Sequence, residues 1–451
     1  MLKPIIIAAV GVAGVAATLP ENNIPSFPSI ETRAPLLWKT KMGAASFRSN
    51  VLFLGNKLYI GSNGDNFRDY GLIEKGSGVY AIDRKSGKAV KHFADETFGD
   101  MDVNGLLIHN NRLYFGNDNE EFLCTDLDGK LLWRNPTSGD IEHEPVLIKT
   151  NQGATVVYAA ESGEIKAVDP QTGNARWSYY VPDFKGWKPG DNRSLFKVKA
   201  WFSNGWQFFT KPLVEDLNKD GVQDLIYCGY GGTLLAINGN SGKELWHTKD
   251  EERIDEGVAL VGTGANRQIV GLRTEWSDDY KIVTSECVFF SLNGKKIKSV
   301  NLEGSNGGNG LNFLSIDNEH VVLNSRTKTY LIGSDSKIST IDRSKSYIDS
   351  GYLSTREEFR NGYNPLFANR TITLDNGKKG LVVLNQHDYA NYKDGFLEIV
   401  SLDDFSVIER ISFPSGSEMP PVIEDVNQDG KLDILISGYD GYLYCYQLPK
   451  Y

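Results

Sequence analysis

The chain has few of the residues from which zinc, redox and nucleic-acid sites are usually built. Its 451 residues include six histidines, four methionines and four cysteines, and no Cys-x-x-Cys pair occurs. Without that spacing the commonest zinc signature is missing. Acidic residues outnumber basic ones by 58 to 48, and no long Lys/Arg tract offsets the formal charge of -10. This balance argues against a nucleic-acid partner.

The four cysteines are too widely separated to suggest a pairing. They are Cys124, Cys228, Cys287 and Cys445. Their surroundings, such as FLCTD and YLYCYQ, are strand-like. An even number permits disulfides in an exported chain, but the spacing does not pair them. We expect them to be small buried apolar side chains.

The longest apolar run is short and lies near the start of the chain. It extends from Ile5 to Leu19, follows a single lysine, and contains the small-residue pattern of a cleavage site. A membrane span needs ~20 residues. We therefore predict a signal peptide at residues 1–19 and a linker at 20–35. The mature protein would be secreted or periplasmic without a stable membrane span. An uncleaved N-terminal anchor is the alternative.

Glycine and aromatic residues are abundant, which is typical of a turn-rich β protein. Four segments share one plan: VYAIDRKSGKAVKHF, FLCTDLDGKLLWRN, IKAVDPQTGNARWSY and LLAINGNSGKELWHT. In each, an alternating apolar strand reaches Asp or Asn, a Gly turn follows, and the next strand brings an aromatic residue. This is a hairpin pattern. Weaker copies are VFFSLNGKKIKSVNL, SKISTIDRSKSY and LEIVSLDDFSVIERI.

The turn glycines of the clear copies recur at a nearly constant interval. They are Gly87, Gly129, Gly173, Gly242 and Gly294, and gaps of 42 and 44 residues separate the first three. That length suits one four-stranded propeller blade. We predict an all-β fold in which residues 36–451 form one closed β-propeller with insertions near 179–209 and 342–370. Eight blades are expected, and seven is the alternative because the sixth copy is faint.

The two chain ends complete one another. The last repeat stops after Tyr442–Gln447, before its Trp-containing strand, whereas LLWKT at Leu36–Thr40 is a spare strand. We expect these segments to pair in one blade, because closing the ring leaves only short, protected strand edges.

The repeat phrase at Ala167–Trp177 and Leu235–Trp246 resembles that of quinoprotein-like (PQQ-like) β-propellers. That family includes quinone-dependent alcohol dehydrogenases and catalytically inert scaffolds. The resemblance implies that Trp177 and Trp246 pack between blades. The dehydrogenases carry adjacent cysteines over the quinone, and no two cysteines are adjacent here, so no quinone is expected.

Two acidic loops have identical spacing, VEDLNKDGVQD and IEDVNQDGKLD. They resemble the calcium loops of FG-GAP or integrin-α-type blades. Alternate residues of such a loop supply oxygen ligands around a Gly turn. The sequence predicts two Ca²⁺ sites, formed by Asp216, Asn218, Asp220, the Val222 carbonyl and Asp224, and by Asp425, Asn427, Asp429, the Lys431 carbonyl and Asp433. Ordinary Asp/Asn/Gly turns are the alternative.

A third unit aligns with the acidic loops but lacks their acids. Its sequence EPVLIKTNQGATVVYAA has Lys149, Thr150 and Asn151 in their place. We expect it to form a blade without a metal. The cations would then stabilise particular blades and take no part in catalysis.

The insertion near 179–209 is the strongest candidate for ligand binding. It places Trp187, Trp201 and Trp206 among lysines, and aromatic residues on long connections often bind partners. Packing as a cap is the alternative. No catalytic residue is assigned, and His143, between two glutamates, is expected in a surface loop.

The function expected from these features is a non-enzymatic binding or assembly scaffold. Its partner would be a protein in the cell envelope or extracellular space. A carbohydrate-binding or polysaccharide-cleaving propeller is the alternative, followed by a quinone-dependent dehydrogenase.

Overall fold

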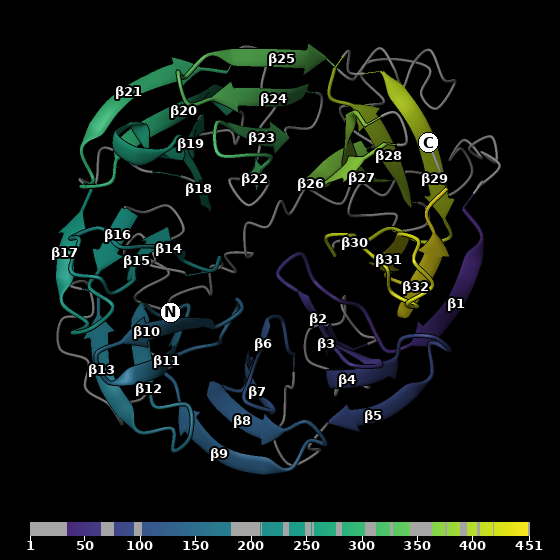
Figure 1. The fold of residues 1–451 in the computed structure, drawn as a ribbon, viewed down its shortest axis with the longest axis horizontal. Coiled ribbons are helices and arrows are strands. Elements are labelled where there is room, and N and C mark those ends of the chain that lie inside the picture. The colour runs from purple at the N-terminus through teal and green to yellow at the C-terminus, as the bar shows by residue number, and fades with distance from the viewer. Residues whose placement is uncertain are drawn as a thin grey trace, which may run out of the picture.

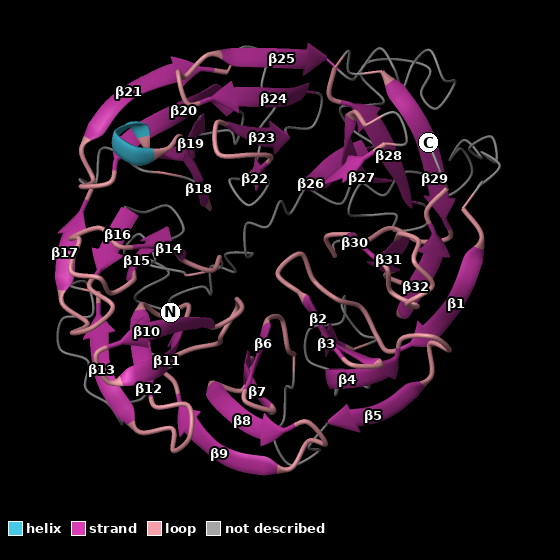
Figure 2. Cartoon of the chain, viewed as in Figure 1, coloured by secondary structure: helices cyan, strands magenta, loops and turns pink. Residues whose placement is uncertain are grey.

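The protein is a ring of eight four-stranded antiparallel sheets, which confirms the prediction of one eight-bladed β-propeller (Figure 1). Strands dominate the described residues, which contain one short 3-10 turn at Gly264–Asn266 (Figure 2). The computed structural model describes residues 34–64, 76–93, 102–181, 208, 210–228, 234–248, 254, 257–276, 282–302, 313–324, 328–342, 363–374, 377–387, 395–403, 406–417 and 419–449.

Each of the first four blades runs from an inner to an outer strand. Blade 1 contains β2 (Val51–Leu54), β3 (Lys57–Asn63), β4 (Ser77–Asp83) and β5 (Ala89–Phe93). Blade 2 contains β6 (Leu106–His109), β7 (Arg112–Asn117), β8 (Glu121–Asp126) and β9 (Leu131–Pro136). Blade 3 contains β10 (Val146–Thr150), β11 (Gly153–Ala159), β12 (Glu164–Val168) and β13 (Ala175–Tyr180). Blade 4 contains β14 (Leu213–Glu215), β15 (Asp224–Cys228), β16 (Leu234–Ile237) and β17 (Glu244–His247).

The second half of the ring continues in the same way. Blade 5 contains β18 (Val258–Val261), β19 (Gln268–Trp276), β20 (Ile282–Ser291) and β21 (Lys296–Asn301). Blade 6 contains β22 (Leu314–Ser315), β23 (His320–Asn324), β24 (Lys328–Gly333) and β25 (Ile338–Asp342). Blade 7 contains β26 (Tyr363–Thr373), β27 (Lys379–His387), β28 (Gly395–Ser401) and β29 (Val407–Phe413). Blade 8 contains β30 (Val422–Glu424), β31 (Asp433–Ser437), β32 (Tyr442–Gln447) and, as its outer strand, β1 (Leu36–Lys41).

Blade 8 closes the ring by joining the two ends of the chain, as the sequence predicted. The N-terminal β1 pairs with β32, with Trp38 opposite Cys445 and Lys41 opposite Tyr442. Figure 1 shows the purple β1 beside the yellow β32. We call this pairing the ring seam.

Because the strands are antiparallel, the connections divide between two faces of the ring. Connections from the first to the second strand and from the third to the fourth lie on one face, called here the lower face. Connections from the second to the third strand and from each blade to the next lie on the other, the upper face.

The hydrophobic core is divided into clusters between neighbouring blades. Successive strand residues point to opposite sides of a sheet. In blade 8, Trp38 and Cys445 therefore pack toward Ile60 of blade 1, while Tyr444 packs toward Phe413 of blade 7. Every blade thus depends on both neighbours to bury its two sides.

An aromatic ring packs on a turn glycine at five blade interfaces. A Cβ atom on each of these glycines would lie 2.2–2.7 Å from the nearest ring atom, so only glycine fits. The pairs are Trp38 on Gly87, Phe93 on Gly129, Trp133 on Gly173, Trp177 on Gly242 and Trp246 on Gly294. The expected blade-packing role of Trp177 and Trp246 is confirmed.

The aromatic residue and the glycine disappear together between blades 5 and 6. Lys298 stands four residues after Gly294, the position at which β9, β13 and β17 carry Trp, and its Nζ donates to the Asp335 carbonyl at 3.3 Å. The facing turn has Ser336 at φ 62° in place of glycine. The hairpin predicted within SKISTIDRSKSY is therefore wrong: the turn precedes Ile338–Asp342, which is the outer strand.

Several smaller expectations can also be compared with the structure. The four cysteines are free and buried, as predicted. Tyr179 and Tyr180, predicted to begin the first insertion, instead end β13, and β26 begins inside the second predicted insertion. Among the described residues no helix is long and apolar enough to span a membrane.

Replacing Gly242 with alanine tests the aromatic-on-glycine packing. The new methyl group would lie 2.6 Å from Trp177 Cδ2, whereas Gly153, also at positive φ, has no atom within 4 Å of its Cβ position. Both substitutions carry the backbone strain, about 1–2 kcal/mol. Overpacking should add about 1–3 kcal/mol to Gly242→Ala only. Thermal melting of both variants measures the difference, and equal decreases in melting temperature would contradict the packing of Trp177 on Gly242.

Candidate functional site

The two acidic loops lie on one face of the ring, and the strands on either side of the two insertions end at the other face. The first Asp loop, Asp216–Asp224, joins β14 to β15, and the second Asp loop, Asp425–Asp433, joins β30 to β31. Both are on the lower face. The insertions join β13 to β14 and β25 to β26, so both leave from the upper face. Trp187, Trp201 and Trp206 themselves lie outside the described residues.

The first Asp loop is a tight turn in which carboxylates accept backbone hydrogen bonds. Asp216 accepts from the N–H groups of Asp220 at 3.2 Å and Gly221 at 3.0 Å. Asp220 accepts from Val222 N at 2.8 Å, and Gly221 has φ 83°. The predicted position of glycine at the sharp bend is confirmed.

Asp224 closes the first Asp loop from the start of β15 and is completely buried. Its Oδ2 accepts from Leu217 N at 3.0 Å, and its Oδ1 accepts from Gly239 N at 3.0 Å and Asn238 Nδ2 at 3.1 Å. Burial nevertheless raises the pKa of Asp224. The loop is therefore joined to the lower-face turn of its own blade.

Sequence inspection did not identify Asn238 as a partner of this loop, although a signal was present. Asn238 occupies the position at which the repeat phrase usually has Asp. Its amide donates to both Asp220 and Asp224, which a carboxylate cannot do.

The second Asp loop repeats this arrangement with one difference. Asp425 accepts from Asp429 N at 2.9 Å and Gly430 N at 3.0 Å. Asp433 is also completely buried, but among the described residues its Oδ1 has no hydrogen-bond partner. Burial raises the pKa of Asp433 to about 6, and the charges of Asp429 and Asp425 act in the same direction.

Each loop gathers a mixed set of oxygen atoms. Within the described ranges, no group of three or more His, Cys, Asp or Glu side chains is arranged to hold a metal ion. Any cation in these loops would therefore also need amide and carbonyl oxygens, which calcium accepts readily.

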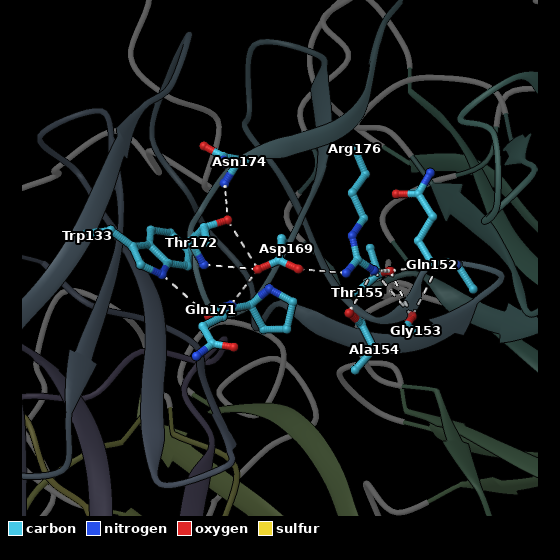
Figure 3. Close-up of polar contacts among 12 residues, drawn as sticks. Trp133, Gln152, Gly153, Ala154, Thr155, Asp169, Gln171, Thr172, Asn174 and Arg176 are labelled. Atoms are coloured by element: carbon cyan, nitrogen blue, oxygen red, sulfur yellow. Dashed lines mark hydrogen bonds and ion pairs between the residues drawn. The ribbon is translucent and has the colours of Figure 1, made fainter.

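Blade 3 has no acidic loop at the corresponding place, and an arginine joins its two lower-face turns (Figure 3). Arg176 donates to Asp169 Oδ2 at 2.8 Å and to the Ala154 carbonyl at 2.8 Å, and it also contacts Thr155. Partial burial raises the pKa of Asp169, but the hydrogen bonds from Arg176 and the Thr172 and Gln171 amides outweigh it and lower the pKa. A guanidinium thus supplies positive charge at this turn.

His143 is buried, so its expected position in a surface loop is wrong. Its Nδ1 donates to the Glu144 carbonyl at 2.8 Å, and burial lowers its pKa to about 4. The flanking acids are compensated by other blades: Glu142 accepts from Arg48 at 2.5 Å, and Glu144 pairs with Lys211. Those partners are distant in sequence.

A cavity of about 710 Å³ lies among the inner strands of blades 1 to 6. Its walls are partly charged, since Glu144 contacts both Lys211 and Asn50, and Arg267 pairs with Glu215 at 3.0 Å. Glu144 thus connects the segments that precede blades 1, 3 and 4, and Arg267 connects blade 5 to blade 4, so each lining cation has an acidic partner.

Residues 75–183 match a PQQ-repeat family model described as outer membrane protein assembly factor BamB. These 109 of 451 residues run from β4 to β13, the arc in which the repeat phrase is clearest. The match supports the PQQ-like repeat assigned from the sequence. No curated protein matches the chain.

Solved structures share the propeller fold at low sequence identity. BamB from Moraxella catarrhalis has a TM-score of 0.52 and 11% identity, with 92% of this chain and 100% of that chain covered. The Dos1 propeller has a TM-score of 0.58 and 12% identity, with 93% of this chain and 96% of that chain covered. A quinohemoprotein alcohol dehydrogenase, ADHIIG from Pseudomonas putida HK5, has a TM-score of 0.55 and 12% identity, with 92% of this chain and 76% of that chain covered. Such similarity establishes the fold and not the activity.

Proposed function

We propose that this protein is an exported, non-enzymatic scaffold that binds a protein partner with the upper face of its propeller. Calcium bound in the two Asp loops stabilises the lower face. The observation that carries the proposal is the separation of the two faces: both insertions leave the upper face, whereas the turns of the lower face are joined to one another.

The similarity to a BamB family model supports an assembly role. The matched arc leads directly into the first insertion, because residue 183 lies just after β13. Long connections on a rigid β scaffold are well suited to recognition, since the scaffold fixes where they begin and end. The three tryptophans of the first insertion would supply large apolar contacts to a protein surface.

Three observations support calcium as a structural cation. The loops place Asp, Asn, Asp and Gly at the spacing of a calcium loop. The buried Asp433 lacks a partner for one oxygen among the described residues. Finally, Arg176 supplies a cation at the equivalent turn of blade 3, where the acids are absent.

Changing Trp187 and Trp206 together to alanine should weaken capture of the partner much more than it lowers the melting temperature. Pull-down from the native envelope or culture fluid, with the partner identified by mass spectrometry, measures the first effect. Leu132→Ala plus Ile297→Ala is the matched control, because these exposed apolar residues lie on outer strands of the ring.

Normal capture by a destabilised Trp187/Trp206 variant would show that the tryptophans are cap residues and would contradict the proposed recognition surface. Binding of wild-type protein to a glycan array, with release of products from a polysaccharide, would favour the carbohydrate alternative.

Removing calcium should lower the melting temperature. Extracellular calcium modules have dissociation constants of about 10⁻⁴–10⁻³ M, and a tenfold excess stabilises each site by about 1.4 kcal/mol. Asp220→Ala plus Asp429→Ala should remove most of the sensitivity to chelator in differential scanning fluorimetry. Asp126→Ala is the control, since Asp126 only accepts turn N–H groups in blade 2 and should leave that sensitivity intact. A wild-type melting curve indifferent to calcium would refute the assignment.

A further inference from the structure

The ring seam leaves blade 8 without a turn that every other blade has. In blades 1 to 7 the third strand continues through a lower-face turn into the fourth. In blade 8 the third strand, β32, ends at Gln447, and the fourth strand, β1, comes from the other end of the chain. Among the described residues, the segments next to these two strand ends meet at the lower face, where Gln447 N donates to the Pro35 carbonyl at 2.9 Å.

The missing turn changes the surroundings of the second Asp loop. In blade 4, Asn238 and Gly239 of this turn satisfy Oδ1 of Asp224. In blade 8, Gln447 replaces only one hydrogen bond of Asn238. Its Nε2 donates to Asp429 Oδ2 at 3.2 Å, as Asn238 donates to Asp220 in blade 4. Within the described residues, Oδ1 of Asp433 has no partner. A buried, partnerless carboxylate oxygen is costly.

The second Asp loop is also bonded to blade 1, across the interface between blades 8 and 1. Arg84 donates through Nε to the Val426 carbonyl at 2.7 Å and through Nη2 to the Asp425 carbonyl at 2.6 Å. The carbonyl of Arg84 in turn accepts from Trp38 Nε1 at 3.0 Å. One residue therefore links the acidic loop of blade 8 to the tryptophan of the seam strand.

A second contact also joins the second Asp loop to blade 1. Gln428 Nε2 donates at 3.4 Å to the Gly55 carbonyl, which also accepts from Arg84 Nη1 at 3.2 Å. The loop thus contacts both lower-face turns of blade 1, the blade against which the seam strand packs.

We propose that the cation of the second Asp loop holds the ring seam closed, whereas that of the first Asp loop stabilises blade 4. This inference depends on the calcium binding proposed above. A cation in the second loop compensates a buried carboxylate that no turn compensates, and it fixes the carbonyls of Asp425 and Val426 to which Arg84 donates. Arg84 then fixes the position of Trp38 and β1.

Hydrogen–deuterium exchange of the purified full-length protein tests the proposal. At 10 mM calcium, a site with a dissociation constant of 10⁻³ M should reduce opening of the seam about elevenfold. Chelator should therefore raise the exchange of amides in β1 and β32 about tenfold in the wild type, by loss of the same stabilisation.

Variants of each loop separate the two sites. Asp429→Ala should make exchange in β1 and β32 fast and insensitive to calcium, while blade 4 remains sensitive. Asp220→Ala should do the reverse. Arg84→Gln, which leaves the loop residues intact, should retain calcium-dependent protection of residues 425–433 but lose most of it in β1. Arg176→Gln is the matched control, because it removes a lower-face guanidinium far from the seam in blade 3.

The outcomes distinguish this inference from the proposed calcium binding. Calcium-dependent protection of residues 425–433 without any effect on β1 and β32 would overturn the seam role alone. An equal response of the seam to Asp220→Ala and Asp429→Ala would overturn it as well. No calcium-dependent protection in either loop would refute calcium binding itself. Should Asp429→Ala fail to fold, Arg84→Gln still decides the matter, since unchanged calcium sensitivity of β1 in that variant contradicts the proposal.

Discussion

At five blade interfaces an aromatic ring lies on a glycine backbone, and this contact holds successive blades together. Trp177 on Gly242 is typical: the glycine has φ 68°, and its missing Cβ leaves room for the indole. The glycine therefore serves the turn and the blade interface together. Both roles recur at five blade interfaces, and Trp38 of the seam strand on Gly87 of blade 1 belongs to the same series. Between blades 5 and 6, Lys298 and Ser336 replace both members, so the pair behaves as one unit.

The two faces of the ring differ in how their connections are used. On the lower face, the side chains of Arg84 and Arg176 bond to turn carbonyls, and the Asn238 amide bonds to the acidic loop of its blade, so the turns are joined to one another. Such contacts fix the turns and leave little freedom for insertions. Both predicted insertions leave from the upper face, where long segments can vary without disturbing blade packing. A scaffold with one fixed face and one variable face suits the binding role proposed here.

Features that repeat locally could be predicted from the sequence, and features that depend on distant partners could not. The blade number, the ring seam and the turn glycines follow from the spacing of short phrases. The blade 6 hairpin was misplaced because Ser336 adopts the positive φ that glycine usually signals. His143 was expected at the surface because glutamates flank it, but Arg48 and Lys211 compensate them from other blades. The role of Arg84 likewise depends on carbonyls more than 300 residues away.

Differential scanning calorimetry of two truncated proteins tests the central claim, that the N-terminal strand completes and seals the ring. Deletion of residues 1–33 leaves β1 intact, whereas deletion of residues 1–42 removes β1 together with Trp38. The first protein should melt as the full chain does. The second should lose its single cooperative transition or aggregate, because β32 becomes an exposed edge and Gly87 loses the indole that covers it. Identical melting of the two proteins would contradict the claim.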